Sequence, residues 1–387
     1  MSERLVLGRR MVQGVAVGPR LRLGERSSLL VVGPTQVGKT SSLVVPAILS
    51  WSGALVTTSV KSDVVEVTRR WRGAFGDVQV LEPGRDGGLT WDPLERIESL
   101  RHALRVAHEL TSRASPHADS EFWNALATKL VAALFVIARQ SRRSVFDVAR
   151  VLDTREFNEW LARPFEAADL LRGFLEHDAK TVDGVITTAE TMLLAWRFPQ
   201  PLARVRDVVH GPHTLYLVSP RGEQRHYESL FRGALRAVLE EQQRLVDAGR
   251  ARPLLLVLDE AATVAPLEDL DELAATLAGL SVTLVTVVQD FSQVSARWGK
   301  RAATIVNNHT TRLVLGGLAD PAVATFLPEA AGSDEAPLRR LAPGTGLVVS
   351  RSAPVARVRL VPWWRQRHLR HRGCDDLATI RWWHRRT

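Results

Sequence analysis

The sequence GPTQVGKT occupies positions 33–40, directly after the short apolar run 29–32, and this combination constrains the fold more than any other part of the chain. It is a complete GxxxxGKT P-loop. Its glycines let the backbone wrap a triphosphate so that successive N–H groups point inward. A helix that begins near Lys39 then directs its positive end at the same phosphates. The order strand, P-loop and helix therefore predicts a nucleotide-binding α/β fold.

The P-loop also predicts which residues hold the nucleotide and its metal ion. Lys39 is expected to contact the β and γ phosphates, and the Thr40 hydroxyl is expected to ligate Mg²⁺. The alternative is a glycine-rich turn that merely precedes a helix. The expected nucleotide-binding residues are Gly33, Pro34, Thr35, Gln36, Val37, Gly38, Lys39, Thr40 and Ser41.

A second apolar run, 253–258, ends in the acidic pair Asp259-Glu260, which has the form of a Walker B element. The strand would deliver Asp259 to the site to hold Mg²⁺ through water, and Glu260 can polarise the attacking water as general base. An acidic pair after a buried strand is common, so this assignment depends on the P-loop upstream. The carboxylate base favours ATP hydrolysis, and the chain has no Asn-Lys-x-Asp signature of guanine recognition.

The run 282–288 is also strand-like and ends at Gln289. In P-loop motors an amide at the end of the strand after Walker B can sense the γ phosphate and the attacking water. The spacing alone is also compatible with a surface glutamine. The predicted catalytic residues are therefore Lys39, Glu260 and Gln289, and the predicted metal ligands are Thr40 and Asp259.

Strand-like and helical segments alternate over most of the chain, which predicts an α/β fold with a mostly parallel sheet wrapped on both faces. Between about 99 and 205 helical periodicity takes over, and this segment is expected to be an inserted all-α domain, either a cap or a module with its own function. The expected strands are 29–32, 54–59, 77–81, 214–218, 253–258, 282–288 and 311–315, with early helices at 39–50 and 62–72. The expected domains are an N-terminal part of the ATPase domain (1–98), the insertion (99–205), a C-terminal part of the ATPase domain (206–360) and a basic tail (361–387).

The composition limits the partners and the cellular compartment that we expect for this protein. A net charge of +9 favours polyanionic partners such as nucleic acid or an acidic membrane surface, although an arginine bias can also reflect a GC-rich genome. The single cysteine, Cys374, excludes an internal disulfide framework and suits a reducing cytoplasm.

The longest uninterrupted apolar run, Leu130–Ala138, is far shorter than the ~20 residues that a membrane-spanning helix needs. We therefore expect a cytoplasmic chain without a transmembrane segment of its own, which reaches the membrane through a partner.

The last 25 or so residues are rich in tryptophan and arginine. Trp363-Trp364 and Trp382-Trp383 bracket a run of arginines. Such residues can stack on bases and bind phosphates, lie at a membrane headgroup layer, or simply pack over the edge of the sheet. The histidines in this tail lack the partners of a metal site. They are His368, His371 and His384.

The order of these motifs resembles the TraG/TraD-type coupling proteins of type IV secretion and conjugation. The P-loop is followed by Val45-Pro46, then by SVKSD at 59–63 and TWDPL at 90–94. The later block, with Asp259-Glu260, Gln289, SQ at 292–293, WG at 298–299 and NN at 307–308, is similar to the second half of that family. The resemblance covers about 25 to 360, and the all-α insertion lies where these proteins place theirs.

The resemblance implies a RecA-like motor of the FtsK/HerA branch, assembled as a homo-hexamer that uses ATP to pass DNA, single-stranded or relaxase-bound, into a secretion channel. It implies that Lys39 and Thr40 bind phosphate and Mg²⁺, Asp259 ligates the metal, Glu260 activates water and Gln289 senses the nucleotide. Lys61 would lie near the nucleotide.

The chain departs from the family pattern in three places. Only about 28 residues precede the P-loop strand, where family members usually carry a transmembrane region. The stretch where the family often has a Gly-Arg pair, which can act as an arginine finger, reads TLAGL at 276–280. Either Arg297, Arg301 or Arg312 substitutes, or the chain hydrolyses ATP slowly, or it needs the finger of another subunit. Ser59 stands where an acidic residue often precedes Lys61. The missing Gly-Arg pair keeps open a nucleotide-gated recruitment scaffold with little turnover. An FtsK-type translocase of double-stranded DNA also stays open, because it would share every catalytic residue.

Overall fold

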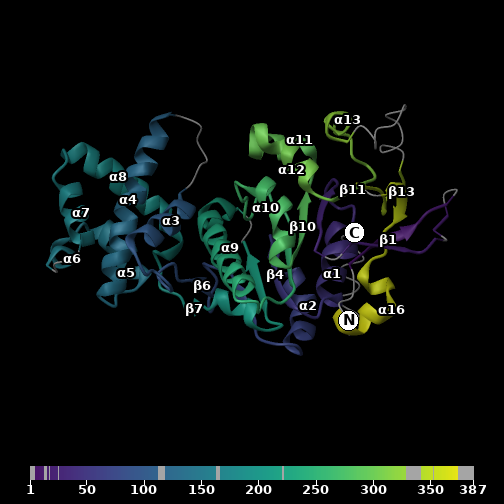
Figure 1. Cartoon of the computed structure of the whole chain (residues 1–387), viewed down its shortest axis with the longest axis horizontal. Coiled ribbons are helices and arrows are strands. Elements are labelled where there is room, and N and C mark those ends of the chain that lie inside the picture. The colour runs from purple at the N-terminus through teal and green to yellow at the C-terminus, as the bar shows by residue number, and fades with distance from the viewer. Residues whose placement is uncertain are drawn as a thin grey trace. The chain divides into compact units, whose positions relative to one another are not determined.

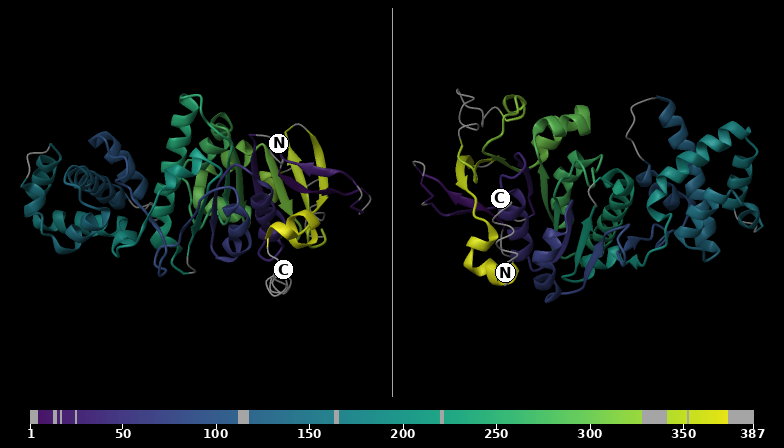
Figure 2. Two further views of the ribbon diagram at one scale, coloured as in Figure 1. Left: turned by 90° about the horizontal axis from the view of Figure 1, so that it is seen from below. Right: turned by 180° about the vertical axis from the view of Figure 1, so that it is seen from behind.

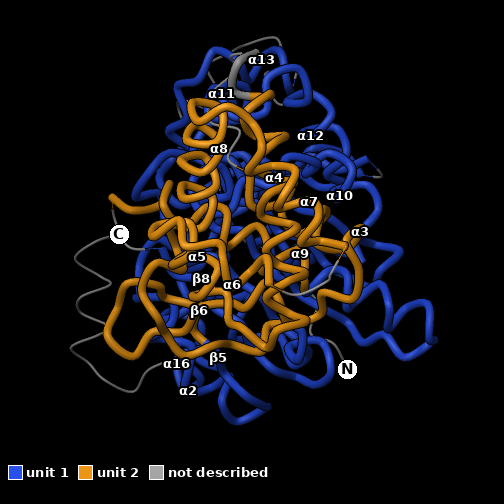
Figure 3. Tube along the Cα trace, turned by 90° about the vertical axis from the view of Figure 1, so that its left-hand side faces the viewer, with its two compact units in different colours: residues 1–79, 206–221, 238–387 blue, residues 80–205, 222–237 orange. Residues whose placement is uncertain are grey.

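The structure is a computed structural model of the whole chain (Figure 1). It describes residues 5–12, 15–16, 18–24, 26–111, 118–162, 166–219, 222–327, 341–351 and 353–373. The chain forms two compact units, one made of 1–79, 206–221 and 238–387 and the other of 80–205 and 222–237 (Figure 3).

The first unit is built on a sheet of eleven strands in the order β2-β1-β13-β12-β11-β3-β10-β9-β4-β8-β5. Five successive pairings from β11 to β8 are parallel, which confirms the predicted α/β fold with a mostly parallel sheet. Nearly every residue of these strands is buried because helices cover the sheet. The parallel strands are β11 (Thr311–Leu315), β3 (Ser28–Val32), β10 (Val282–Val288), β9 (Leu254–Leu258), β4 (Ala54–Ser59) and β8 (Thr214–Val218).

Beyond β11 the sheet continues with antiparallel strands that the sequence patterns did not predict. They come from both ends of the chain. β12 (Thr345–Ser350) pairs with β11 and with β13 (Ala353–Arg359), β13 pairs with β1 (Val6–Arg10), and β1 pairs with the edge strand β2 (Arg20–Arg22). The other edge is β5 (Val78–Leu81). The hairpin of β1 and β2 extends from the sheet in the ribbon views (Figure 2).

Helices follow the parallel strands as the alternation predicts. After the P-loop the chain forms a π-helical turn, η1 (Thr40–Val44), which leads directly into α1 (Val45–Ser50) with Pro46 in its first turn. α1 packs with α2 (Asp63–Gly73) and with α16 (Arg367–Gly373). A second group consists of α10 (Leu270–Thr276), α11 (Phe291–Trp298) and α12 (Ala302–Asn308).

The second unit is mainly helical. Its core helix α4 (Ala118–Gln140) packs against α3 (Leu100–Leu110), α5 (Val145–Thr154), α7 (Glu166–Leu175) and α8 (Ala179–Met192). Its window Glu121–Gln140 is the one stretch among the described residues that is long and apolar enough to cross a membrane, and just over half of that window is buried inside the structure. The short strands β6 (Thr90–Trp91) and β7 (Leu202–Ala203) pair, and α6 (Asn158–Leu161) and the first half of α9 (Gln224–Asp247) complete the unit.

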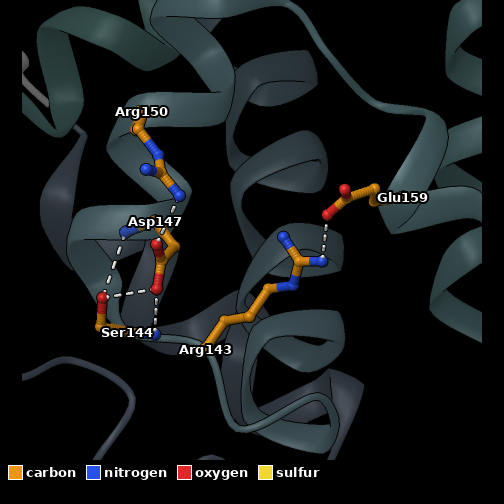
Figure 4. A network of polar contacts seen from close by, with 5 residues as sticks. All are labelled: Arg143, Ser144, Asp147, Arg150 and Glu159. Atoms are coloured by element: carbon orange, nitrogen blue, oxygen red, sulfur yellow. Dashed lines mark hydrogen bonds and ion pairs between the residues drawn. The ribbon is translucent and has the colours of Figure 1, made fainter.

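The start of α5 shows how local sequence fixes these helices. The Ser144 hydroxyl accepts the Asp147 N–H, and the Asp147 carboxylate accepts the Ser144 N–H, which completes a capping box (Figure 4). Arg150 then pairs with Asp147 at 3.0 Å, and Arg143 pairs with Glu159 at 2.9 Å. The capping box thus gives two N–H groups at the start of α5 an acceptor.

Candidate nucleotide site

The P-loop begins where β3 ends, and close packing shapes it. A Cβ on Gly33 would lie 2.8 Å from the Leu315 Cβ of β11, so glycine fits this position. Gln36 and Gly38 adopt left-handed backbone conformations, with φ of 65° and 85°. That conformation favours glycine.

The Lys39 ammonium lies inside this loop. Its Nζ donates to the carbonyl oxygens of Gly33 at 2.5 Å and Pro34 at 2.8 Å. Burial lowers the pKa of Lys39, and Glu260 and Asp259 oppose that shift. The cation is therefore held by two neutral carbonyls, which phosphate oxygens could replace.

Thr40 and Asp259, the predicted metal ligands, lie next to each other. The Thr40 hydroxyl donates to the Asp259 carboxylate at 3.1 Å, and the Thr58 hydroxyl donates to the Asp259 carbonyl at 2.7 Å. Burial, together with the charge of Glu260, raises the pKa of Asp259 to about 7, against the opposing effects of Thr40 and Lys39. A buried carboxylate whose charge is poorly compensated fits a site for a divalent cation.

The donor atoms of this pair are a hydroxyl and a carboxylate oxygen, and Mg²⁺ takes oxygen ligands. In the described residues no group of three or more His, Cys, Asp or Glu side chains could hold a metal ion. A cation held by Thr40 and Asp259 would complete its coordination with water and phosphate oxygens, which is how Mg²⁺ is usually bound beside nucleotides. The residues present thus fit the expected Mg²⁺.

Glu260 and Gln289 are joined directly. The Gln289 side-chain amide donates to the Glu260 carboxylate at 3.0 Å. Glu260 has a left-handed backbone, with φ of 53°, an uncommon conformation for a residue other than glycine. Unfavourable backbone geometry of this kind is found at functional sites, where the surrounding structure maintains it. The sheet thus brings together the two predicted catalytic residues of different strands.

Hydrogen bonds with the start of the following helix, α11, fix the backbone around Gln289. The Gln289 N–H donates to the Gln293 side-chain oxygen at 3.0 Å, and the Gln293 N–H donates to the Asp290 carboxylate at 2.6 Å. Asp290 is therefore the N-cap of α11.

Asp320 is a residue near this site that the sequence reasoning missed. One of its carboxylate oxygens accepts the N–H groups of Phe291, at 2.7 Å, and Ser292, at 3.0 Å. The other accepts the Ser292 hydroxyl at 2.9 Å. Asp320 thus caps α11 from the loop that follows β11. The Asp320-Pro321 pair signals a turn in the sequence, but no local pattern links it to residue 291.

The other residues near the expected site are placed as follows. Lys61 is exposed, and its backbone exchanges hydrogen bonds with the Ser59 hydroxyl. Of the expected finger arginines, Arg312 is buried in β11, Arg301 contacts Asp271 at 3.3 Å, and Arg297 is exposed on α11.

The described part of the tail packs onto the first unit. Trp363 and Trp364, in the short helix η6 (Trp363–Arg365), are buried, and Arg372 donates to the Leu49 carbonyl while it lies over the Trp71 ring. These two indoles are therefore packing residues and offer no faces to bases. Residues beyond 373, which include Cys374, Trp382, Trp383 and His384, lie outside the described residues.

The fold is that of the RecA-like P-loop nucleoside triphosphatases, with one strand, β10, between the P-loop strand β3 and the Walker B strand β9. The model of the family Type IV secretory system Conjugative DNA transfer matches residues 3–336. The chain belongs to that family, which confirms the resemblance seen in its motifs.

Individual relatives agree with this placement. The conjugal transfer protein TraG of Escherichia coli is 23% identical over 320 residues, which cover 72% of this chain and 50% of TraG. The protein VirD4 of Agrobacterium fabrum is 24% identical over 354 residues, which cover 82% of this chain and 52% of VirD4. The chain thus spans about half the length of these curated relatives. The bacterial conjugative coupling protein TrwBdeltaN70, solved with sulphate, has a similar fold, with a TM-score of 0.72 at 18% identity, over 93% of this chain and 94% of that one.

Proposed function

We propose that this chain is the ATP-hydrolysing motor of a coupling protein that recruits DNA, single-stranded or relaxase-bound, and drives it into a type IV secretion or conjugation channel. The observation that carries the proposal is the contact between Gln289 and Glu260, next to the Thr40–Asp259 pair. Structures of TrwB with ADP and Mg²⁺ and with a non-hydrolysable ATP analogue support nucleotide binding in a fold of this kind.

Each residue then has a defined task. The P-loop amides of 33–41 cradle the phosphates, and Lys39 exchanges its two carbonyl partners for β and γ phosphate oxygens. Thr40 and Asp259 hold Mg²⁺, which when bound supplies positive charge at the transferred phosphoryl group. Glu260 accepts a proton from the attacking water, and Gln289 orients Glu260 and responds to the γ phosphate.

Assembly completes the proposal. We expect a homo-hexamer in which each subunit offers an arginine to its neighbour's phosphates. Burial removes Arg312 from this role, so Arg297 and Arg301, both at exposed positions, are the candidates to test. The insertion at 99–205 is proposed to act as a separate module. The membrane parts of the secretion machinery are the proposed partners, and they would hold this chain at the cytoplasmic face.

The test is the ATPase rate with Mg²⁺, measured against protein concentration, with and without single- and double-stranded DNA, beside the native mass. Lys39→Ala is expected to lose nucleotide binding. Glu260→Gln keeps an oxygen that can accept from the Gln289 amide, so this variant should still bind ATP. Its ATPase rate should fall by a factor of about 10² to 10⁴, because the general base is lost. Glu156→Gln, at an exposed carboxylate of the other unit, is the matched control. A wild-type rate no higher than that of Lys39→Ala would contradict the motor function.

A recruitment scaffold gated by nucleotide is the second candidate, because the chain lacks the Gly-Arg pair between Walker B and β10. A scaffold would bind ATP tightly and assemble with it, but its ATPase rate would stay near zero at every protein concentration. Stimulation by double-stranded DNA alone would instead favour an FtsK-type translocase.

A further inference from the structure

Arginines of three adjacent strands lie in a row on the antiparallel side of the sheet. Arg9 of β1 is directly opposite Arg359 of β13 on one side and Arg20 of β2 on the other. Residues directly opposite in antiparallel strands point to the same face, so these three side chains, the arginine row, share one face. Arg357 and Arg22 lie two residues along their strands, and since side chains alternate with period two they belong to the same face. All five are exposed.

This arrangement is unfavourable for the protein alone. Like charges directly opposite one another on neighbouring strands destabilise a sheet. Among the residues that the structure describes, no ion pair joins any of the five arginines to a carboxylate, whereas arginines such as Arg143 and Arg206 do have acidic partners. The row therefore has the charge and the spacing to receive several anionic groups at once.

An apolar tip lies at the end of the same hairpin. Val12 and Val15, the hairpin tip, are 51% and 59% exposed, and each donates its N–H to the carbonyl of the other, at 2.9 and 3.0 Å. The bonds hold the two valines side by side. Exposed valines at the end of a projecting hairpin are not explained by packing within the unit.

The distances between tip and row match those of a lipid surface. Strands rise ~3.3 Å per residue, so Val12 lies roughly 10 Å beyond Arg9. The polar layer of a bilayer is about 5 to 8 Å deep on each side of the hydrocarbon core. When the valines reach the hydrocarbon boundary, the arginines near the tip are thus at the level of the phosphate groups. A nucleic acid would match the arginines but would leave the valines unused.

We propose that the β1–β2 hairpin, with the arginine row and the hairpin tip, is a binding site for a membrane surface of anionic phospholipid. The basic side chains bind the phosphates of the headgroups and the valines enter the interface, the combination by which basic, partly apolar segments attach to membranes. This contact is independent of ATP turnover and of a membrane partner.

The experiment is co-sedimentation of the full chain with vesicles of phosphatidylcholine, with and without phosphatidylglycerol, in the absence of nucleotide. The wild type should bind only the anionic vesicles. The triple variant Arg9→Gln, Arg20→Gln, Arg359→Gln should bind the anionic vesicles about a hundredfold more weakly, because each arginine near the surface raises the affinity roughly fivefold. Val12→Ser with Val15→Ser should also weaken binding. A thermal melt of each variant checks its folding.

A matched triple variant controls for net charge: Arg101→Gln, Arg105→Gln and Arg225→Gln change exposed arginines of the other unit. It should bind like the wild type. Equal losses in the two triple variants, or unchanged binding of the row variant, would overturn the proposal. Unchanged binding of the valine variant would overturn insertion of the tip. Loss of single-stranded DNA binding in the row variant, with vesicle binding retained, would assign the row to nucleic acid instead.

Discussion

Replacing Asp320 with alanine tests whether the loop after β11 holds Gln289 in place. Asp320 accepts two backbone N–H groups of α11 and the Ser292 hydroxyl, at 2.7, 3.0 and 2.9 Å. Hydrogen bonds to a charged acceptor contribute about 1.5 to 3 kcal/mol each when buried. Ser292 is exposed and recovers water, so we expect Asp320→Ala to cost about 1.5 kcal/mol in total.

That free energy sets two expected results. The melting temperature should fall by about 3 to 6 °C, at ~2 to 4 °C per kcal/mol for a unit of this size. If the same contacts keep Gln289 aligned with Glu260, the aligned fraction falls by about tenfold, and kcat falls by up to that factor while the Kd for ATP is unchanged.

The assays are differential scanning fluorimetry and steady-state ATPase kinetics, beside direct titration of a nucleotide analogue. Ser292→Ala, which removes the hydroxyl but leaves the N–H groups, is the control and should show a small part of each effect. A lowered melting temperature with wild-type kcat would show that Asp320 stabilises the fold without positioning Gln289. An unchanged melting temperature would refute the energetic reasoning itself.

Two further predictions concern buried groups of the first unit. Burial lowers the pKa of His309 to about 4 from an ordinary 6.5, so the unfolded state binds more protons below pH 6.5. The stability should therefore fall by about 2 kcal/mol between pH 7.5 and 5, as measured by urea unfolding, and His309→Gln should flatten that slope; an unchanged slope would contradict the assignment. The buried Arg72 guanidinium donates to the carbonyls of Trp51, Gly53 and Pro212 and to the Thr214 hydroxyl. Arg72→Met leaves those acceptors unsatisfied and should cost about 3 to 4 kcal/mol in the same assay, whereas Arg70→Met, at an exposed position of α2, should cost little.

Most of the nucleotide site could be predicted from the sequence because each part is a local pattern. A short apolar run that ends in a glycine-rich loop, an acidic pair or an amide identifies both the strand and its functional end. Parallel strands then bring those ends to one edge of the sheet. Thr40 with Asp259, and Glu260 with Gln289, are in contact for this reason.

The antiparallel side of the sheet was not predictable in the same way. β1 is five residues long and β2 is three, and both are rich in arginine, so neither has the alternating apolar pattern of a half-buried strand. The pairing of β1 with β13 joins segments about 350 residues apart in the chain (Arg9 with Arg359), which no local pattern encodes. Asp320 was missed for the same reason, since its partners lie 28 and 29 residues earlier.

The edge strand β2 also affects how the protein behaves at high concentration. An open sheet edge presents unpaired N–H and C=O groups to which a strand of another molecule can add. Here the edge is only three residues long, and two of those residues are the exposed arginines Arg20 and Arg22. Two such edges that approached each other would bring four positive charges together, so repulsion would oppose edge-to-edge polymerisation of the sheet.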